Sequence, residues 1–258
     1  MTYRKKGCFN SAVVYGRNQV FELIRANKRS INKIMISKTA KGTIISNIVN
    51  LAKQKKISIY IVPSKKLKKE FQHSHGVIAE VSSTKYIELS DLTKKLKNHT
   101  DQLLVILDSI KDPNNLGAII RNCVAFNVDG VIIPKWRAAG INETISRSSA
   151  GAVEHIRISR VANINQTITF LKEHGFWIIG ADNSGQTLEA VNLPPFPIAL
   201  IIGSEGFGLQ NLIKRNCDFL ISIPQNNTIS SLNASCASSI ILYEISKIRK
   251  QLFSNLKK

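Results

Sequence analysis

The chain has 258 residues, and 43% of them are hydrophobic, which is ordinary for a globular protein and excludes a disordered one. No apolar run reaches the roughly 18 to 20 residues that a membrane helix needs, and no apolar stretch of a signal peptide follows the basic N-terminus. These features predict a cytoplasmic protein. Its four cysteines, Cys8, Cys123, Cys217 and Cys236, are far apart, which favours reduced thiols over disulfides or metal ligands.

The chain is strongly basic, and the charge is unevenly spread. Lys and Arg number 36 against 17 Asp and Glu, a net charge of +19. Residues 1–100 hold 21 basic and 5 acidic side chains, whereas residues 101–258 hold 15 and 12. A basic portion joined to a near-neutral one favours an N-terminal module that binds nucleic acid. Two other interpretations are solvated surface lysines in a lysine-rich proteome and a membrane surface, which the lack of a basic amphipathic segment disfavours.

The N-terminal part predicts a compact α/β unit. Helical spacing at 20–24 and 44–52, β-rich runs at 33–36, 57–62 and 76–81, and a basic helix from residue 65 follow one another. The polar segment after residue 82 predicts a connection between domains. We therefore expect a nucleic-acid-binding domain over residues 1–85, a linker over 86–100 and a second domain over 101–258.

Strands and helices alternate from residue 101 onward. Strands are predicted at 103–107, 130–133, 156–161, 176–180, 198–203 and 219–223. Helices are predicted at 116–125, 164–174, 209–217 and 232–252. Near-continuous apolar strands separated by helices are typical of an α/β domain whose parallel sheet is covered on both faces.

Three loops that leave predicted strands have unusual composition, and ligands of parallel sheets bind at such loops. The first holds Asp112-Pro113-Asn114-Asn115, so we expect Asn114 or Asn115 to cap the next helix. Arg121 lies one to two turns into that helix. A capped helix with a surface arginine explains this loop equally well when it is taken alone.

The second loop, 203–208, contains three glycines around Glu205, which allows close backbone approach to a ligand. A plain strand-to-helix turn is the alternative, and the dinucleotide-binding spacing is absent. The third loop, 224–235, is dense in Asn and Ser before a long helix. A helix cap explains either Ser230 or Ser231 but not the whole polar cluster, so we expect these side chains to face a ligand or a partner.

The segments DPNNLGAIIRN, IIGSEGFGL and ISIPQNNTISSLNASCASSIILYE together resemble the three motifs of the SpoU/TrmH family of RNA ribose 2'-O-methyltransferases. Their order over residues 108–244 makes the match specific, although each motif alone is weak. YGRNQV at 15–20 and HGV at 75–77 resemble the ribosomal-protein-like RNA-binding domain of one subgroup. That subgroup methylates a guanosine of bacterial large-subunit (23S) rRNA.

This resemblance implies a trefoil-knotted C-terminal domain, a homodimer formed through it, S-adenosylmethionine as methyl donor, and no metal. Motif match implies cofactor contacts, largely through backbone atoms, at Gly203, Ile223 and Leu232. It implies a reactive site made of Asn115, Arg121, Glu205, Ser231 and Asn233. Asn127 and Asn227 stand where the family commonly has glycine, and asparagine tolerates left-handed backbone dihedrals.

The difficult part of the implied reaction is activation of the nucleophile, because a ribose hydroxyl is a poor acid near neutral pH. The site must hold it in line and stabilise the developing negative charge. We expect Arg121 to do this rather than act as a base, because a guanidinium resists deprotonation. Asn115 and Asn233 would orient it, Ser231 would hold a phosphate or sugar, and Glu205 would balance its charge.

Two alternative functions remain at this point. The same chemistry could act on tRNA, although family tRNA enzymes usually carry short helical extensions in place of the N-terminal domain. The chain could also be a catalytically silent RNA-binding or ribosome-assembly protein. The intact set of reactive residues argues against the second alternative.

Overall fold

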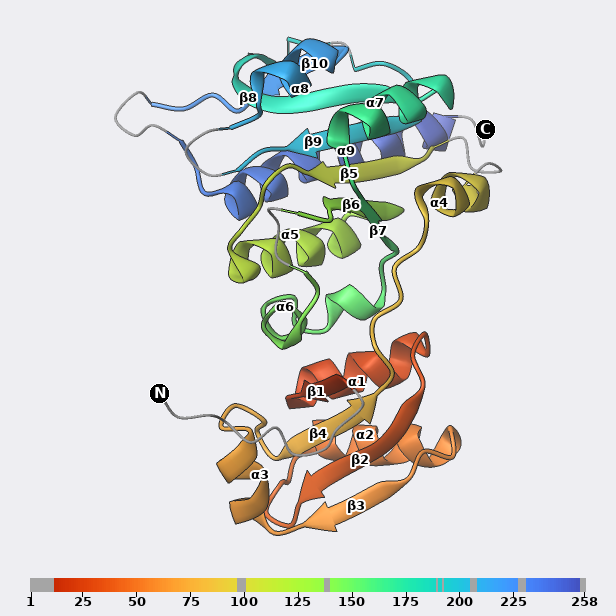
Figure 1. Cartoon of the computed structure of the whole chain (residues 1–258), viewed down its shortest axis with the longest axis vertical. Coiled ribbons are helices and arrows are strands. Elements are labelled where there is room, and N and C mark those ends of the chain that lie inside the picture. Colours follow the sequence, from red (N-terminus) through yellow and green to blue (C-terminus); the bar gives the residue numbers. More distant parts are fainter. Residues whose placement is uncertain are drawn as a thin grey trace. The chain divides into compact units, whose positions relative to one another are not determined.

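The computed structural model describes residues 12–96, 101–136, 140–188, 190–191, 193–204, 208–226 and 231–255 (Figure 1). The chain forms two compact units, and we describe each by itself. The N-terminal unit comprises residues 1–85 and 141–155, and the sheet unit comprises residues 86–140 and 156–258. None of the helices in the described ranges has the length and apolar character needed to cross a membrane.

The N-terminal unit is built on a four-stranded sheet in the order β1-β4-β2-β3. Its strands are β1 (Ala12–Tyr15), β2 (Ile31–Ser37), β3 (Ile59–Val62) and β4 (Val77–Val81), and its first helices are α1 (Arg17–Ala26), α2 (Thr43–Gln54) and α3 (Ser64–Glu70). Strand β4 is antiparallel to β1 and β2, while β2 and β3 are parallel. Buried Leu23 and Ile24 of α1 and Ile48 of α2 pack in one core with the strands. The predicted α/β unit is confirmed, and β1 is an additional strand.

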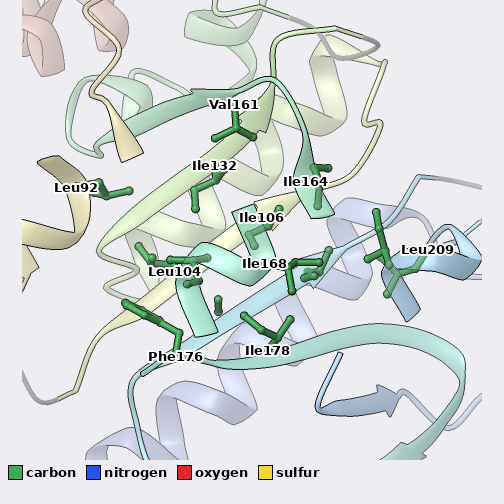
Figure 2. Packing of buried hydrophobic residues seen from close by; sticks show 14 of the residues in the cluster. Leu92, Leu104, Ile106, Ile132, Val161, Ile164, Ile168, Phe176, Ile178 and Leu209 are labelled. Carbon is green, nitrogen blue, oxygen red and sulfur yellow. The ribbon is translucent and has the colours of Figure 1, made fainter. Parts of the chain in front are cut away.

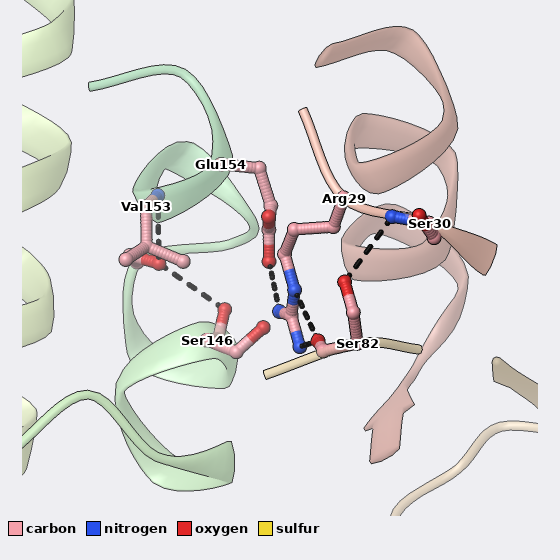
Figure 3. A network of polar contacts seen from close by, with 7 residues as sticks. Arg29, Ser30, Ser82, Ser146, Val153 and Glu154 are labelled. Carbon is pink, nitrogen blue, oxygen red and sulfur yellow. Dashed lines mark hydrogen bonds and ion pairs between the residues drawn. The ribbon is translucent and has the colours of Figure 1, made fainter. Parts of the chain in front are cut away.

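Residues 141–155 also belong to the N-terminal unit, although they lie between two strands of the sheet unit in the sequence. They form α6 (Glu143–Ser148) and a 3-10 helix (Ala152–Glu154). The Arg29 guanidinium donates to Glu154 Oε1 at 2.9 Å, and both side chains are more than nine-tenths buried. Arg29 Nε also donates to the Ser82 carbonyl at 2.9 Å (Figure 3). A buried ion pair, whose arginine also donates to a backbone carbonyl, therefore holds residues 141–155 within the unit.

The sheet unit contains a six-stranded parallel sheet in the order β10-β8-β9-β5-β6-β7. Its strands are β5 (Leu103–Leu107), β6 (Gly130–Pro134), β7 (Ile158–Val161), β8 (Trp177–Thr187), β9 (Ile198–Ile202) and β10 (Phe219–Ser222). These strands confirm the predicted parallel α/β domain. Asn127, in the turn before β6, has a φ of 54°, which confirms the expectation that asparagine adopts the left-handed conformation there.

Helices cover both faces of this sheet. They are α4 (Leu89–Leu96), α5 (Pro113–Ala125), α7 (Ile164–Glu173), α8 (Asn211–Asn216) and α9 (Ala234–Asn255). Figure 2 shows Leu92 of α4 and Ile168 of α7 in one core with Leu104 and Ile106 of β5. Helices α5 and α9 lie side by side on the opposite face. Residues 86–100, expected as a linker, therefore include a helix whose leucines are buried in this core.

The order of the strands creates a switch point between β5 and β9. From β5 the chain winds outward through β6 to β7, crosses to β8, and returns to β9 beside β5. In parallel sheets the loops after two such strands diverge to opposite faces, which opens a crevice at their carboxyl ends. The loops after β5, β9 and β10 carry the three unusual segments of the sequence.

Candidate functional site

A cavity of about 250 Å³ lies at the carboxyl ends of β9 and β10, against the middle of β8 and beside the start of α9. We call it the glycine-loop cavity. Its walls include all three residues expected to bind the cofactor, together with one residue of the expected reactive site: Gly203, Ile223, Leu232 and Ser231. Two of the three unusual loops, those after β9 and β10, thus meet in one space.

The backbone closes tightly at Gly203. A Cβ atom there would lie 2.4 Å from the backbone carbon and oxygen of Gly208, and Gly208 N donates to Ser204 O at 3.0 Å. Only glycine fits so close a backbone contact. Glu205, the expected acidic member of the site, falls outside the described residues.

An irregularity in β8 brings additional polar residues to the glycine-loop cavity. The pairing of β8 with β10 jumps from Gly180 opposite Leu220 to Gln186 opposite Ile221, so the intervening residues leave the ladder. Among them, Asp182 and Asn183 line the cavity. Sequence reasoning missed both, because the predicted strand ended at residue 180 and no motif marks a bulge.

Asp182 forms the main charged contact of this cavity. Its Oδ2 lies 2.8 Å from Lys214 Nζ, and its Oδ1 accepts from Ser184 N and Oγ at 3.1 and 2.6 Å. Burial raises the pKa of Asp182, but the hydrogen bonds from Lys214 and Ser184 and the lysine charge outweigh burial and hold it below its ordinary value. Lys214 also lines the cavity and was likewise missed by sequence reasoning.

Asn233 begins helix α9 and connects it to α5. Its Oδ1 accepts from Ser235 N at 2.9 Å, which is the hydrogen bond of a helix cap. The expected cap at Ser231 is therefore wrong, and Ser230 lies outside the described residues. Asn233 Nδ2 donates to Asn115 Oδ1 at 3.1 Å. Two residues expected in the reactive site are thus in direct contact.

Asp112, and neither of the asparagines, caps α5. Its side chain accepts from Asn114 N at 3.0 Å, with Pro113 at the first helical position. Proline has no backbone N–H group. It suits the first helical position because an N–H group there has no partner within the helix. The expected cap at Asn114 or Asn115 is wrong for this reason, and the Asn115 side chain is available to contact Asn233.

Arg121 lies on an exposed face of α5 and does not line the glycine-loop cavity. Among the described residues it makes no hydrogen bond or ion pair. The next residue fixes the helix: Asn122 Nδ2 donates to Ser235 O, Ser238 Oγ and Ser239 Oγ at 3.0, 2.9 and 2.7 Å. The helix that carries Arg121 is therefore fixed to α9, while the guanidinium itself is available to a ligand.

Within the described part of the chain, no group of three or more His, Cys, Asp or Glu side chains is placed to hold a metal ion. The glycine-loop cavity instead offers backbone groups, amides, hydroxyls and one ion pair, with Ile202, Ile221 and Ile241 as apolar wall. Such a mixture suits an organic ligand with a flat apolar part and a charged end.

Fold and cavity together define an α/β enzyme class that binds its ligand in loops at the carboxyl edge of a parallel sheet. Comparison with known families agrees: the SpoU rRNA Methylase family matches residues 102–243, and the RNA 2'-O ribose methyltransferase substrate-binding family matches residues 13–87. The chain belongs to the SpoU family of RNA methyltransferases.

Similar proteins cover nearly the whole chain. YacO of Bacillus subtilis, named as a TrmH family tRNA/rRNA methyltransferase, is 39% identical over 92% of this chain and 95% of its own. A Staphylococcus aureus (strain COL) protein of the same family name is 40% identical over 92% and 96%.

Solved structures share the fold. The SpoU methyltransferase AviRb of Streptomyces viridochromogenes superposes with a TM-score of 0.78, at 22% identity, over 93% of this chain and 90% of its own. The A. aeolicus TrmH/SpoU tRNA modifying enzyme reaches a TM-score of 0.52 at 30% identity, over 63% of this chain and 83% of its own.

Proposed function

We propose that this protein transfers a methyl group from S-adenosylmethionine to a ribose 2'-hydroxyl of RNA, at a guanosine of large-subunit (23S) rRNA. The observation that carries the proposal is that two of the three motif loops, those after β9 and β10, meet at one cavity, while Asn115 of the remaining motif contacts Asn233. Gly203, Ile223 and Leu232 line this cavity, and the Asn115–Asn233 contact lies at the start of the same helix α9. Membership of the SpoU family supplies the reaction class.

The glycine-loop cavity fits this cofactor in chemical character. Its apolar isoleucines suit a purine, and the Asp182–Lys214 pair suits the hydroxyls or the charged amino-acid end. AviRb has been crystallised in complex with the cofactor AdoMet, and it covers 93% of this chain. When bound, the cofactor supplies a methyl group already activated on sulfonium. Gly203 would permit its close approach to the backbone.

The other residues of the site would act on the ribose 2'-hydroxyl. Arg121 would stabilise negative charge on the 2' oxygen and clamp a neighbouring phosphate through its planar fork. Asn115 and Asn233 would orient the substrate, and Ser231 would hold sugar or phosphate at the cavity wall. Glu205 would balance the charge of Arg121. A guanidinium keeps its proton, so phosphate or solvent would receive the proton of the hydroxyl.

The choice of rRNA rests on the N-terminal unit. This unit matches the substrate-binding family and holds most of the positive charge of the chain. The A. aeolicus tRNA modifying enzyme covers 63% of this chain, whereas the S. meliloti rRNA methyltransferase covers 92%, with a TM-score of 0.75 at 22% identity. A separate RNA-binding unit suits a large substrate, and its affinity should depend on salt.

We also infer a trefoil knot and a homodimer formed through the sheet unit. Membership of the SpoU family supports the knot. In support of the dimer, α9 exposes apolar side chains at Ile240, Tyr243 and Leu252.

The test is transfer of labelled methyl from S-adenosylmethionine to undermethylated total RNA, with rRNA and tRNA separated and the labelled nucleoside identified. We expect label in 2'-O-methylguanosine of large-subunit rRNA. Label in tRNA would keep the chemistry and overturn the substrate. Failure both to bind the cofactor and to label any RNA would favour the silent RNA-binding alternative.

A further inference from the structure

A second cavity, of about 540 Å³, lies at the switch point of the sheet. We call it the switch-point cavity. It is lined by the loops after β5 and β9: Asp108, Ser109, Lys111, Ser204, Gly208, Leu209, Gln210 and Asn211. Ser204 and Gly208 also line the glycine-loop cavity, so the two spaces share a wall. A second ligand bound here would lie directly beside the first.

The most buried polar group of the switch-point cavity is the Asp108 carboxylate. The residue is only 2% exposed, and its backbone N–H donates to Ile202 O at 2.8 Å, which fixes it at the end of β5. Its Oδ1 accepts from Ser109 Oγ at 2.9 Å and from Gln210 Nε2 at 3.4 Å. Within the described ranges, Oδ2 accepts no hydrogen bond. Asp108 lines the cavity, so a donor on a ligand can reach an oxygen that still has room to accept.

The loop around Asp108 is held in a strained conformation. Ser109 has a φ of 60°, a left-handed value that costs a serine about 1 kcal/mol or more. This turn places the Ser109 hydroxyl on Oδ1 of its neighbour, so both Ser109 and Gln210 orient the same oxygen. The exposed Lys111 adds a cation that can meet a phosphate. The cavity thus pairs a fixed acceptor with an exposed cation.

A carboxylate can only accept hydrogen bonds, which restricts the ligand. Among nucleobases, guanine presents adjacent N–H donors, N1–H and the 2-amino group, on its Watson–Crick edge. Uracil presents a single N–H between two carbonyl oxygens, which a carboxylate repels. We propose that Asp108 reads the Watson–Crick edge of the acceptor base in the switch-point cavity and selects guanine. This inference rests on the proposed methyl transfer to RNA.

The test compares guanosine with inosine, which lacks only the 2-amino group, at the labelled position of an RNA fragment. That position is taken from the transfer experiment above. Wild-type protein should favour guanosine over inosine at least tenfold in kcat/KM. Asp108→Asn, which turns one acceptor into a donor, should lower kcat/KM for guanosine about 100-fold and remove the preference. Cofactor affinity should stay within twofold, because Asp108 does not line the glycine-loop cavity.

Two further variants separate recognition from folding. Gln210→Leu removes one donor that orients Asp108 and should reduce the preference for guanosine severalfold, whether or not Asp108→Asn folds. Asp91→Asn changes an exposed carboxylate on α4 and should change nothing.

The outcomes are distinct. An unchanged preference in both Asp108→Asn and Gln210→Leu, or label in a nucleoside other than guanosine, would overturn this inference and leave methyl transfer standing. No label from the wild-type protein on any RNA would overturn the proposed function, and this inference with it.

Discussion

The two units of this protein handle charge in different ways. The N-terminal unit holds most of the basic excess, and its most buried ion pair, Arg29–Glu154, joins two parts of the unit to each other. The sheet unit is nearly balanced in charge, and its polar side chains gather around two cavities with a common wall. Under the proposed function, this difference predicts that affinity for RNA and the chemistry of methyl transfer depend on separate units. Substitutions should therefore affect one without the other.

The largest expected effect is on the fold of the N-terminal unit. Arg29→Met leaves Glu154 buried without its partner, and we expect a loss of about 3 to 5 kcal/mol in the free energy of unfolding. Replacing both residues, Arg29→Met with Glu154→Leu, should recover most of the loss. Urea denaturation measures both. Arg25→Met breaks an exposed pair with Glu22 and should cost under about 1 kcal/mol; equal losses for Arg25 and Arg29 would refute the role of the buried pair.

Arg121→Ala tests the chemistry of the sheet unit. We expect turnover to fall about 10²- to 10³-fold, because a fixed donor to the developing oxyanion is removed. Cofactor affinity should change less than threefold, because Arg121 does not line the glycine-loop cavity. Steady-state transfer and equilibrium cofactor binding measure the two quantities. Arg157→Ala, an exposed arginine of the same unit, is the control, and normal turnover in Arg121→Ala would remove Arg121 from the site.

Gly203→Ala tests the glycine-loop cavity. The added methyl meets the Gly208 backbone at 2.4 Å, so the loop must open. If the cost of overpacking, about 1 to 3 kcal/mol, falls on the bound state, cofactor binding should weaken roughly 5- to 150-fold. Titration calorimetry measures the affinity for the cofactor. Among the described residues, a Cβ at Gly140 would meet Tyr86 Oη alone, at 4.0 Å, so Gly140→Ala should bind the cofactor normally. The same behaviour in Gly203→Ala would show that the cofactor binds elsewhere.

A smaller effect is expected from the basic surface of α3. Replacing Lys65 and Lys66 by Ala should weaken RNA binding. The slope of log affinity against log salt concentration should become shallower by about 0.7 for each phosphate that the variant no longer neutralises. Turnover at saturating RNA should not change. Lys94 and Lys95, exposed on α4 of the sheet unit, give a matched double variant with the same change in charge. A greater drop in RNA affinity in that control would contradict the proposal that the N-terminal unit supplies most of the affinity for RNA.

The smallest effect concerns pH and Asp182. Because its pKa is lowered in the folded protein, Asp182 stabilises the fold fully above its unfolded pKa of about 3.9, and this contribution is lost as the pH falls through the folded value. The difference in unfolding free energy between wild type and Asp182→Asn should be constant from about pH 7 to 5 and shrink below about pH 4. Urea denaturation at each pH measures it. A difference that grew as the pH fell would mean that the folded protein does not lower the pKa of Asp182.

Most of the helices and strands, and the family motifs, could be predicted from the sequence alone. Apolar strands such as Leu103–Leu107 and Ile198–Ile202 are buried along their whole length in the parallel sheet, so their composition alone identifies them. Gly203, Ile223 and Leu232 could be named from motif order. Gly203 and Ile223 meet in one cavity because the carboxyl ends of parallel strands lie at the same edge of the sheet.

Contacts between segments that are distant in the sequence could not be predicted in this way, because they depend on the three-dimensional fold. Residues 141–155 have no compositional mark that assigns them to the N-terminal unit; the buried contact of Glu154 with Arg29 does so. Asp182 reaches the glycine-loop cavity through a break in the pairing of β8, and Asp108 lies at a switch point that the order of the strands creates. Periodicity reports which face of an element is buried, whereas these positions depend on which strands become neighbours.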